Sequence, residues 1–333
     1  MNHLPLDQKA SRLALGMAAL GRPGYINLTH SGDLPDVTIE GMRGHAWAML
    51  DTAWKHGIRH FDCARSYGRA EEFVGGWLRA RQDTGVLRPD IVTISSKWGY
   101  EYTANWQIDV DGPHEIKDHS LQMLQKQWGE TQSHLAGWLD LYQIHSATLS
   151  TGVLDDPAVI AELARLRDEH GIRVGLTLSG TGQARTLDKA LTVMVDGAPL
   201  FSSVQATWNL LERSAGDALA AAHDAGWMVI VKEALANGRL TPANDDPTFA
   251  GQRRILREAA ARLNTTVDAL ALAAVLHNPW ADVVLLGAAQ HDHLESNVQA
   301  LDVAFDQDAA DHLSGLAEPP GEYWRHRSRL AWN

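Results

Sequence analysis

The chain has a single cysteine, Cys63, among its 333 residues, and it has no long apolar run. One cysteine cannot form an internal disulfide, so the sequence fits a reducing compartment such as the cytoplasm. No segment approaches the roughly 18 apolar residues that cross a bilayer. The first nine residues lack the basic and apolar regions of a secretory signal. We therefore expect a soluble cytoplasmic protein that does not associate with membranes.

Basic residues are scarce relative to acidic ones. The formal net charge is −12, and such a chain repels phosphates, which argues against a nucleic-acid partner. The composition is otherwise that of a globular protein, with 45% hydrophobic and 21% charged residues. We find no repeat, low-complexity segment or linker, so the sequence predicts one domain over residues 1–333.

Eight short apolar segments recur along the chain, and each is followed by a helical pattern. The predicted strands are residues 13–17, 58–64, 91–96, 139–144, 174–178, 203–207, 227–231 and 283–286. Strands that alternate with helices are typical of a parallel sheet, and eight such units indicate a closed barrel. The predicted fold is a (β/α)8 TIM barrel.

Several helix boundaries carry signals of their own. Thr38 is a candidate N-cap for a helix that ends at Gly57. Asp156 and Pro157 form an N-cap followed by a first-turn proline. A polar and aromatic loop follows the third strand, and a helix is predicted after it over residues 115–136.

The stretch from residue 57 to residue 78 is predicted to be a strand, a loop and a helix. Asp62 ends the strand and Tyr67 lies in the loop. The helix has apolar residues at the spacing of one face, namely Ala70, Phe73, Val74, Trp77 and Leu78. Two interpretations remain open at this point. Asp62 and Tyr67 are either catalytic groups at a strand end or a helix cap and a packing residue.

Two later strands also end in polar side chains, Lys97 and His145. Strand ends of a barrel share one mouth, so these side chains should converge with Asp62 and Tyr67. A free tyrosine has a pKa of about 10, and a nearby ammonium lowers it. A buried lysine needs a carboxylate to stay charged, and a histidine can direct a carbonyl oxygen. Together, the four residues indicate an acid–base site that protonates or deprotonates an oxygen atom beside a reacting carbon.

Three segments of the chain resemble the aldo-keto reductase superfamily. Residues 61–72 are similar to the family's signature of Asp, Ala, Tyr-Gly and Glu-Glu. Residues 95–99 resemble its lysine strand, and residues 140–145 resemble its histidine strand. All four expected catalytic residue types are present in order. The resemblance extends from about residue 13 to about residue 300, so it covers most of the chain.

The resemblance implies an oxidoreductase that passes hydride between a nicotinamide and the carbonyl or alcohol carbon of a small aldehyde, ketone or sugar. Tyr67 is then the general acid, and Lys97 and Asp62 tune it. His145 orients the substrate. The cofactor, NAD or NADP, carries the hydride while the protein supplies geometry and electrostatics.

The resemblance also implies cofactor-binding positions at the ends of the later strands. These positions are Thr177, Ser179, Gln205, Lys232, Gly287, Ala288, Ala289, His293 and Asn297. Some neighbours depart from the family pattern. Leu178 stands where the family has a carboxamide-binding asparagine, and Lys232 stands where a tyrosine stacks on the nicotinamide, so Trp208 or the Lys232 stem must cover the ring. Backbone amides after Gly287 can bind phosphate. No Arg or Lys follows this glycine closely, so the preference between NAD and NADP stays open.

The remaining predictions concern the substrate and the overall role. Trp98, Tyr100 and Trp106 follow the third strand and are expected to contact the substrate. His291 and His293 lack the partner pattern of a metal site, so we expect no metal. A nucleotide-binding barrel that senses redox state and regulates a partner, with little turnover, is the alternative function. The sequence predicts no particular oligomeric state.

Overall fold

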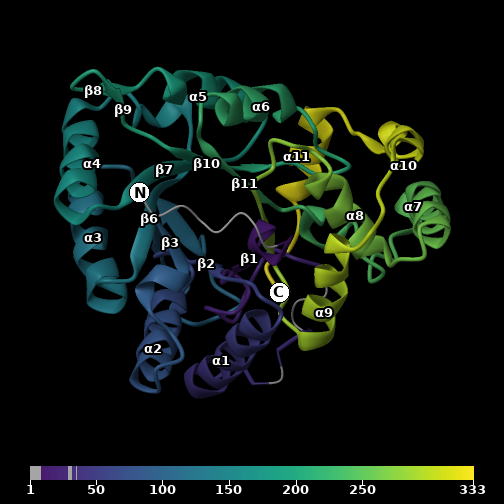
Figure 1. The fold of residues 1–333 in the computed structure, drawn as a ribbon, viewed down its shortest axis with the longest axis horizontal. Coiled ribbons are helices and arrows are strands. Elements are labelled where there is room, and N and C mark those ends of the chain that lie inside the picture. Colours follow the sequence, from purple (N-terminus) through teal and green to yellow (C-terminus); the bar gives the residue numbers. More distant parts are fainter. Residues whose placement is uncertain (1–8, 29–31, 35) are drawn as a thin grey trace.

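Eight parallel strands close into a barrel in the computed structural model, which describes residues 9–28, 32–34 and 36–333. The barrel strands are β1 (Leu13–Gly16), β2 (His60–Asp62), β3 (Thr93–Trp98), β6 (Leu139–Ala147), β7 (Arg173–Leu178), β10 (Ser203–Thr207), β11 (Met228–Lys232) and β12 (Val283–Leu286). β12 pairs with β1 and closes the ring. The strands lie at the centre of Figure 1 with helices around them. The predicted (β/α)8 TIM barrel is confirmed.

All eight predicted strands are present, and their ends differ from the prediction by only a few residues. The start of the chain and parts of the connection between the first predicted strand and the helix capped by Thr38 lie outside the described residues. The α-helices are α1 (Ile39–Lys55), α2 (Ala70–Asp83), α3 (Leu121–Leu135), α4 (Pro157–His170), α5 (Gln183–Leu191), α6 (Gly216–Asp224), α7 (Ala250–Arg262), α8 (Val267–Leu276), α9 (His291–Val298), α10 (Gln307–His312) and α11 (Pro320–Arg327).

Shorter elements fill the connections. The 3-10 helices are Lys9–Arg12, Pro89–Ile91, Leu149–Thr151, Ala236–Gly238, Pro247–Phe249, Gln299–Leu301 and Ser314–Leu316. Two antiparallel pairs lie outside the barrel: β4 (Tyr100–Tyr102) with β5 (Glu115–Lys117), and β8 (Met194–Val195) with β9 (Ala198–Pro199). Both predicted N-caps are confirmed. Thr38 Oγ1 accepts a hydrogen bond from Gly41 N (3.1 Å), and Asp156 Oδ1 accepts one from Ala158 N (2.9 Å).

The helix predicted over residues 115–136 is wrong at its start. Residues 115–117 form β5 instead, because they pair with β4 in an antiparallel hairpin. The helix α3 begins only after Ser120, whose Oγ accepts a hydrogen bond from Met123 N (3.2 Å). The three residues of β5 alternate polar, apolar and polar, a strand period that a long helical window hides. The connection after β3 therefore contains an ordered hairpin.

The helix face predicted after the second strand is confirmed, because all five of its apolar residues are buried in α2. The same helix carries a buried carboxylate, Glu71. It accepts hydrogen bonds from Ser96 Oγ (2.6 Å) and Thr131 Oγ1 (2.8 Å) and pairs with Arg65 (2.5 Å). These partners lie on β3, on α3 and in the loop after β2. Glu71 thus fastens the loop that holds Tyr67 to the barrel wall.

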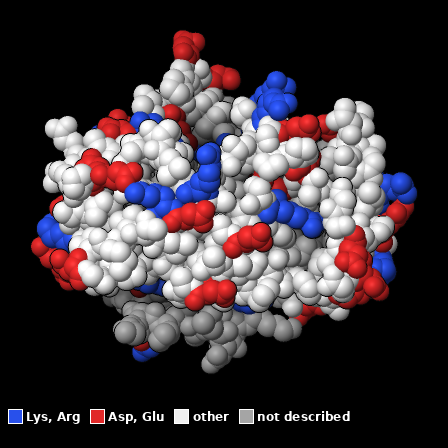
Figure 2. All heavy atoms as spheres, turned by 90° about the horizontal axis from the view of Figure 1, so that it is seen from above, with Lys and Arg blue, Asp and Glu red and all other residues white. Residues whose placement is uncertain are grey.

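The outer surface mixes charges of both signs. On the face shown in Figure 2, Lys and Arg side chains are interspersed with Asp and Glu side chains, and this face has no broad basic patch. Among the described residues, no single helix is long and apolar enough to cross a membrane. The helical segments over residues 247–262 and 267–276 are long and apolar enough only when they are counted as one, and the chain bends by 80° between them.

The Glu71 contacts predict a local effect on stability. We expect Glu71→Ala to lower the free energy of unfolding by roughly 3 kcal/mol, because Arg65 loses its buried partner and two hydroxyls lose an acceptor. The neighbouring change Glu72→Ala is the control. Glu72 forms only a solvent-exposed pair with Arg69, so its loss should cost less than about 1 kcal/mol. Denaturant unfolding at pH 7 measures both, and equal costs would contradict the buried role of Glu71.

Candidate active site

A cavity of about 520 Å³ opens at the carboxyl ends of the barrel strands. Its lining includes Gly16 and Asp62 at the ends of β1 and β2, and Lys232 at the end of β11. In (β/α)8 barrels this end of the strands carries the active site. The cavity is therefore the candidate active site.

Asp62 and Lys97 form a buried ion pair at the base of the cavity. Lys97 Nζ lies 2.5 Å from Asp62 Oδ2 and donates a second hydrogen bond to the Cys63 carbonyl (2.8 Å). The same ammonium lies 4.6 Å from the centroid of the Tyr67 ring. The lysine is fully enclosed, so its charge acts on Tyr67 without screening by water.

The Asp62 carboxylate has further hydrogen-bond donors from three strands. Ser95 Oγ donates to Asp62 Oδ1 (2.6 Å), and two glutamine amides lie at longer range, Gln143 at 3.4 Å and Gln205 at 3.3 Å. His60 Nε2 lies 2.8 Å from Ser95 Oγ. These donors offset the cost of burying the carboxylate and fix its orientation.

Tyr67 is a protonated phenol in this environment. Burial and the Asp62 carboxylate raise its pKa well above the usual value, and Arg22 only partly opposes them. From the sequence, we expected a nearby ammonium to lower this pKa. The pKa is raised instead, because the ring is removed from water and because Asp62 compensates the charge of Lys97.

His145 stands beside Tyr67 as a neutral imidazole. Burial, followed by the charges of Lys97 and Lys232, lowers its pKa well below the usual value. Its Nδ1 lies 3.4 Å from Ser66 Oγ, and its ring centroid lies 5.6 Å from that of Tyr67. A neutral imidazole at this place is a hydrogen-bonding group for a substrate oxygen.

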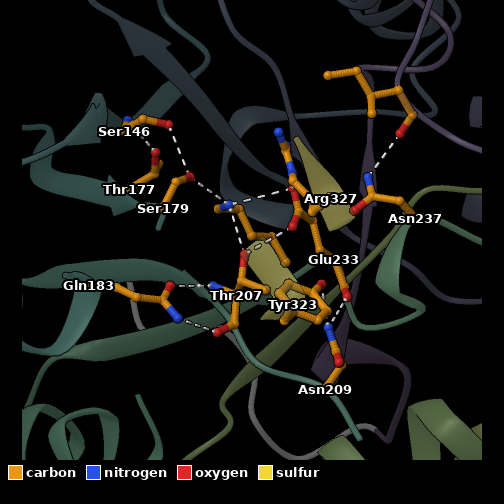
Figure 3. A network of polar contacts seen from close by, with 12 residues as sticks. Ser146, Thr177, Ser179, Gln183, Thr207, Asn209, Glu233, Asn237, Tyr323 and Arg327 are labelled. Atoms are coloured by element: carbon orange, nitrogen blue, oxygen red, sulfur yellow. Dashed lines mark hydrogen bonds and ion pairs between the residues drawn. The ribbon is translucent and has the colours of Figure 1, made fainter. Parts of the chain in front are cut away.

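A polar network borders the cavity on the side of β7, β10 and β11 (Figure 3). Lys232 Nζ donates hydrogen bonds to Ser179 Oγ (3.1 Å) and to Thr207 Oγ1 (2.9 Å). Burial lowers the pKa of Lys232 to about 8. Ser146 Oγ lies 3.3 Å from Ser179 Oγ, which extends the network to β6.

Glu233 lies between two cations in the same network. Arg327 Nη2 pairs with its Oε1 at 2.7 Å, and Lys232 Nζ lies 3.8 Å from the same oxygen. Burial works against ionisation, yet Arg327 and Lys232 lower the pKa of Glu233 to about 2. Two cations and one carboxylate leave this wall of the cavity with a net positive charge.

The opposite end of the cavity is lined by residues of β12 and α9. Asn297 Nδ2 donates a hydrogen bond to Asp268 Oδ2 (2.7 Å). The other oxygens, Asn297 Oδ1 and Asp268 Oδ1, are buried and have no partner. Unpaired buried acceptors beside a cavity fit a ligand that brings hydrogen-bond donors, such as an amino group of a nucleobase.

A family model matches residues 37–318, which is most of the chain, and its description is the Aldo/keto reductase family. The chain belongs to the aldo/keto reductase family. Membership implies an oxidoreductase that acts on carbonyl groups.

Solved structures of aldo/keto reductases share the fold. Aldo-keto reductase AKR11C1 from Bacillus halodurans, solved in a holo form, is 21% identical with a TM-score of 0.68, and the match covers 92% of each chain. A Pseudomonas aeruginosa protein assigned to the aldo-keto reductases is 23% identical with a TM-score of 0.60, covering 91% of this chain and 90% of that one. A search of curated proteins finds no match.

The structure brings most of the predicted aldo/keto reductase site together. The predicted residues that line the cavity are Asp62, Tyr67, Tyr100, His145, Ser179, Gln205, Lys232, Gly287, Ala288, His293 and Asn297. Lys97 is enclosed behind Asp62 and Tyr67 and does not itself line the cavity. Thr177 and Ala289 are buried outside the lining, and Thr177 Oγ1 accepts a hydrogen bond from Ser146 N (2.7 Å).

The two tryptophans predicted to contact substrate are not brought to the cavity. Trp98 is fully buried, and its ring packs edge-on against His119. Trp106 lies in the connection after β4, where its Nε1 donates a hydrogen bond to the Val37 carbonyl (2.7 Å). Trp208, considered as a cover for the nicotinamide, packs against Trp280 instead. Of the two side chains considered as a cover for the nicotinamide, Lys232 lines the cavity and Trp208 does not.

Several side chains that line the cavity were not predicted from the sequence, and four of them come from segments outside the barrel strands. Arg22 follows β1, Glu115 lies on β5, Arg327 ends α11, and Trp332 pairs with Ile26 through an isolated β-bridge. The C-terminal end lies near β1 in Figure 1. None of these residues stands at a barrel-strand end, so strand patterning gave no signal for them. Within the described ranges, no group of three or more His, Cys, Asp or Glu residues is arranged to hold a metal.

The depressed pKa of Glu233 predicts a pH-dependent contribution to stability. The folded value of about 2 lies below the ordinary value of 4.5. The contribution is therefore fully present above about pH 5 and is lost as the pH falls toward 2. We expect Glu233→Gln to destabilise the protein by roughly 3 kcal/mol at pH 7, by roughly 2 kcal/mol at pH 3.5 and by much less near pH 2. Denaturant unfolding of the parent and of Glu233→Gln across this pH range measures the cost of the substitution. Glu322→Gln, at an exposed position on α11, is the control. A difference in unfolding free energy between parent and Glu233→Gln that does not change with pH would contradict the prediction.

Proposed function

We propose that this protein is an NAD(P)-dependent oxidoreductase that interconverts a carbonyl carbon and an alcohol carbon in a small aldehyde, ketone or sugar. One observation carries the proposal. A protonated tyrosine, Tyr67, stands between the buried Asp62–Lys97 ion pair and the neutral His145 at the cavity. This arrangement supplies a proton and a hydrogen bond to one oxygen atom, which carbonyl reduction requires.

Each of these side chains has a distinct task in the proposal. Tyr67 donates its phenolic proton to the carbonyl oxygen as the carbon is reduced. The Lys97 ammonium stabilises the negative charge that then develops on the phenol oxygen. Asp62 pairs with the buried Lys97 ammonium and holds it beside Tyr67. His145 donates a hydrogen bond from Nε2 that orients the carbonyl oxygen, because its Nδ1 faces Ser66.

The residues around the cavity fit a dinucleotide. A nicotinamide cofactor, when bound, supplies or accepts the hydride. Ser179 and Gln205 offer polar groups for a carboxamide, and Lys232 with Arg327 offers positive charge for phosphates. Asn297, with its unpaired buried Oδ1, would hold the base. The carboxylate of Glu233, which alone would repel phosphate, is neutralised by its two cationic neighbours.

The cavity has little to hold a 2′-phosphate. The segment over residues 289–297 has no Arg or Lys, and it contains Asp292 and Glu295. Arg239 pairs with Glu318 (3.0 Å) and does not line the cavity. Asp33, in contrast, lines the cavity together with His293, and a carboxylate there favours an unmodified ribose. We propose NAD as the better cofactor.

The tyrosine is tested by removing its hydroxyl. We expect Tyr67→Phe to lower kcat by roughly 100- to 10,000-fold, because positioned acid catalysis is lost, while cofactor affinity changes little. Steady-state assays at the nicotinamide absorbance and a fluorescence titration of the cofactor measure the two quantities. Tyr142→Phe, on β6 and outside the cavity lining, is the control. Activity within about threefold of the parent would remove Tyr67 from the mechanism. If the parent protein binds the cofactor fully but turns over no carbonyl compound, the regulatory alternative is favoured.

The cofactor preference is tested by kcat/KM for NAD(H) and NADP(H) at pH 7–8 and moderate salt. We expect the unphosphorylated form to be used as well as or better than the phosphorylated form, because a 2′-phosphate meets Asp33 without a basic partner. A tenfold preference for the phosphorylated form, about 1.4 kcal/mol, would contradict the expectation.

A further inference from the structure

The β4–β5 hairpin presents one polar face to the cavity. Side chains alternate along a strand, so Tyr100 and Tyr102 share a face with their cross-strand partners Lys117 and Glu115. Tyr100 and Glu115 line the cavity. Lys117 Nζ donates a hydrogen bond to the Ser146 carbonyl (2.7 Å), which fixes the hairpin to β6. This face stands beside Tyr67 and His145, where the substrate would lie.

Arg22 meets this face from the other side of the cavity. It is only 2% exposed, and its Nη1 pairs with Glu115 Oε2 at 3.0 Å and donates to the Ser66 carbonyl at 2.6 Å. Its guanidinium lies 5.5 Å from the Tyr67 ring centroid and 4.6 Å from that of Trp332. Its Nε is buried without a hydrogen-bond partner. An arginine clamped between rings loses little entropy when it binds a ligand.

We propose that the Arg22–Glu115 pair is a substrate-recognition element that selects an uncharged compound with hydroxyl groups next to the reacting carbonyl. The element joins a donor and an acceptor on the wall that holds Tyr67. The inference rests on the carbonyl–alcohol chemistry proposed above, and it adds the substrate class and the residues that choose it.

The charges of the pair decide which substrate fits. Arg22 and Glu115 compensate each other, so the pair has no net charge with which to attract an anionic or a cationic substrate. A hydroxyl group both donates and accepts, so it can bond to either member without breaking the pair. An alkyl chain at the same place would cover both charged groups and offer them no hydrogen bond, which is costly. Sites built to bind a substrate hydroxyl reject analogues that lack it.

Trp332 and Tyr102 lie against the Arg22 guanidinium, and Tyr102 is also the cross-strand partner of Glu115. The indole of Trp332 stacks on His114, with ring centroids 4.2 Å apart and planes within 3°. The Arg22 guanidinium lies over the same indole. Tyr100 packs edge-on against His145, with centroids 4.9 Å apart. The recognition element is linked to the proposed catalytic group His145 through Tyr67, whose ring lies 5.5 Å from the Arg22 guanidinium and 5.6 Å from the His145 ring.

Turnover of matched substrates tests the inference. Glyceraldehyde and propanal have the same carbon skeleton, and so have erythrose and butanal. The parent protein should favour the hydroxylated member by at least about 100-fold in kcat/KM. Arg22→Met should bring the ratio to within about fivefold, chiefly by raising KM for the hydroxylated member. Glu115→Gln, which keeps the shape, should lower the same ratio and serves if Arg22→Met does not fold. Arg165→Met, which removes an exposed pair with Glu162 on α4, should leave the ratio unchanged. A parent ratio below about tenfold, or ratios that the two variants do not change, would overturn the inference.

Equilibrium binding separates this inference from the proposed function. Xylitol and 1,5-pentanediol are titrated into Tyr67→Phe in the presence of cofactor, and tryptophan fluorescence reports binding. We expect xylitol to bind at least about tenfold more tightly, and Arg22→Met in the same background to abolish the difference. If the variants behave in this way but the parent protein turns over no carbonyl compound, the recognition element is sustained and the oxidoreductase proposal is rejected. If the parent protein reduces carbonyl compounds but Tyr67→Phe binds xylitol and 1,5-pentanediol equally, the oxidoreductase proposal is sustained and the recognition element is rejected.

Discussion

The buried ion pair between Asp62 and Lys97 is the interaction on which the rest of the site depends. Removing two charges from water is unfavourable unless the geometry is close and the remaining hydrogen-bonding capacity is used. The chain meets both conditions. The pair lies at 2.5 Å, Ser95 donates to the carboxylate, and the Cys63 carbonyl accepts from the ammonium. Strands β2 and β3 must therefore stay in register. The same requirement holds Tyr67 at a fixed distance from a charge that water cannot screen.

The barrel was predictable from the sequence because its signal is local and repeated. Each unit has a short apolar strand and a helix with one apolar face, and the polar residues near the carboxyl ends of the strands gather at or just behind the common mouth. Asp62, Lys97 and His145 follow this rule. Thr38 and Asp156 predicted the starts of their helices correctly, because an N-cap acts within a few residues of the sequence. The fold and the centre of the site could be read from such patterns.

The rest of the site depends on contacts between distant segments. Trp98 was expected at the mouth, but the alternation of side chains along β3 turns it into the core. The hairpin of β4 and β5 was hidden because strands of three residues leave almost no periodicity. Arg22, Arg327 and Trp332 reach the cavity from connections and from the last helix, where no strand pattern exists. Their places are set by tertiary packing, which a single sequence does not display.

The closure of the barrel has a consequence for the order of folding. Leu13 on β1 pairs with Val284 on β12, and Arg12 donates a hydrogen bond to the Ala281 carbonyl 269 residues away. One edge of β1 thus stays unpaired on a ribosome until nearly the whole barrel sequence has emerged. Contacts of such high sequence separation slow folding and leave intermediates with open strand edges. The half-built barrel consequently exposes strand edges that can pair with other chains, a hazard that closure removes.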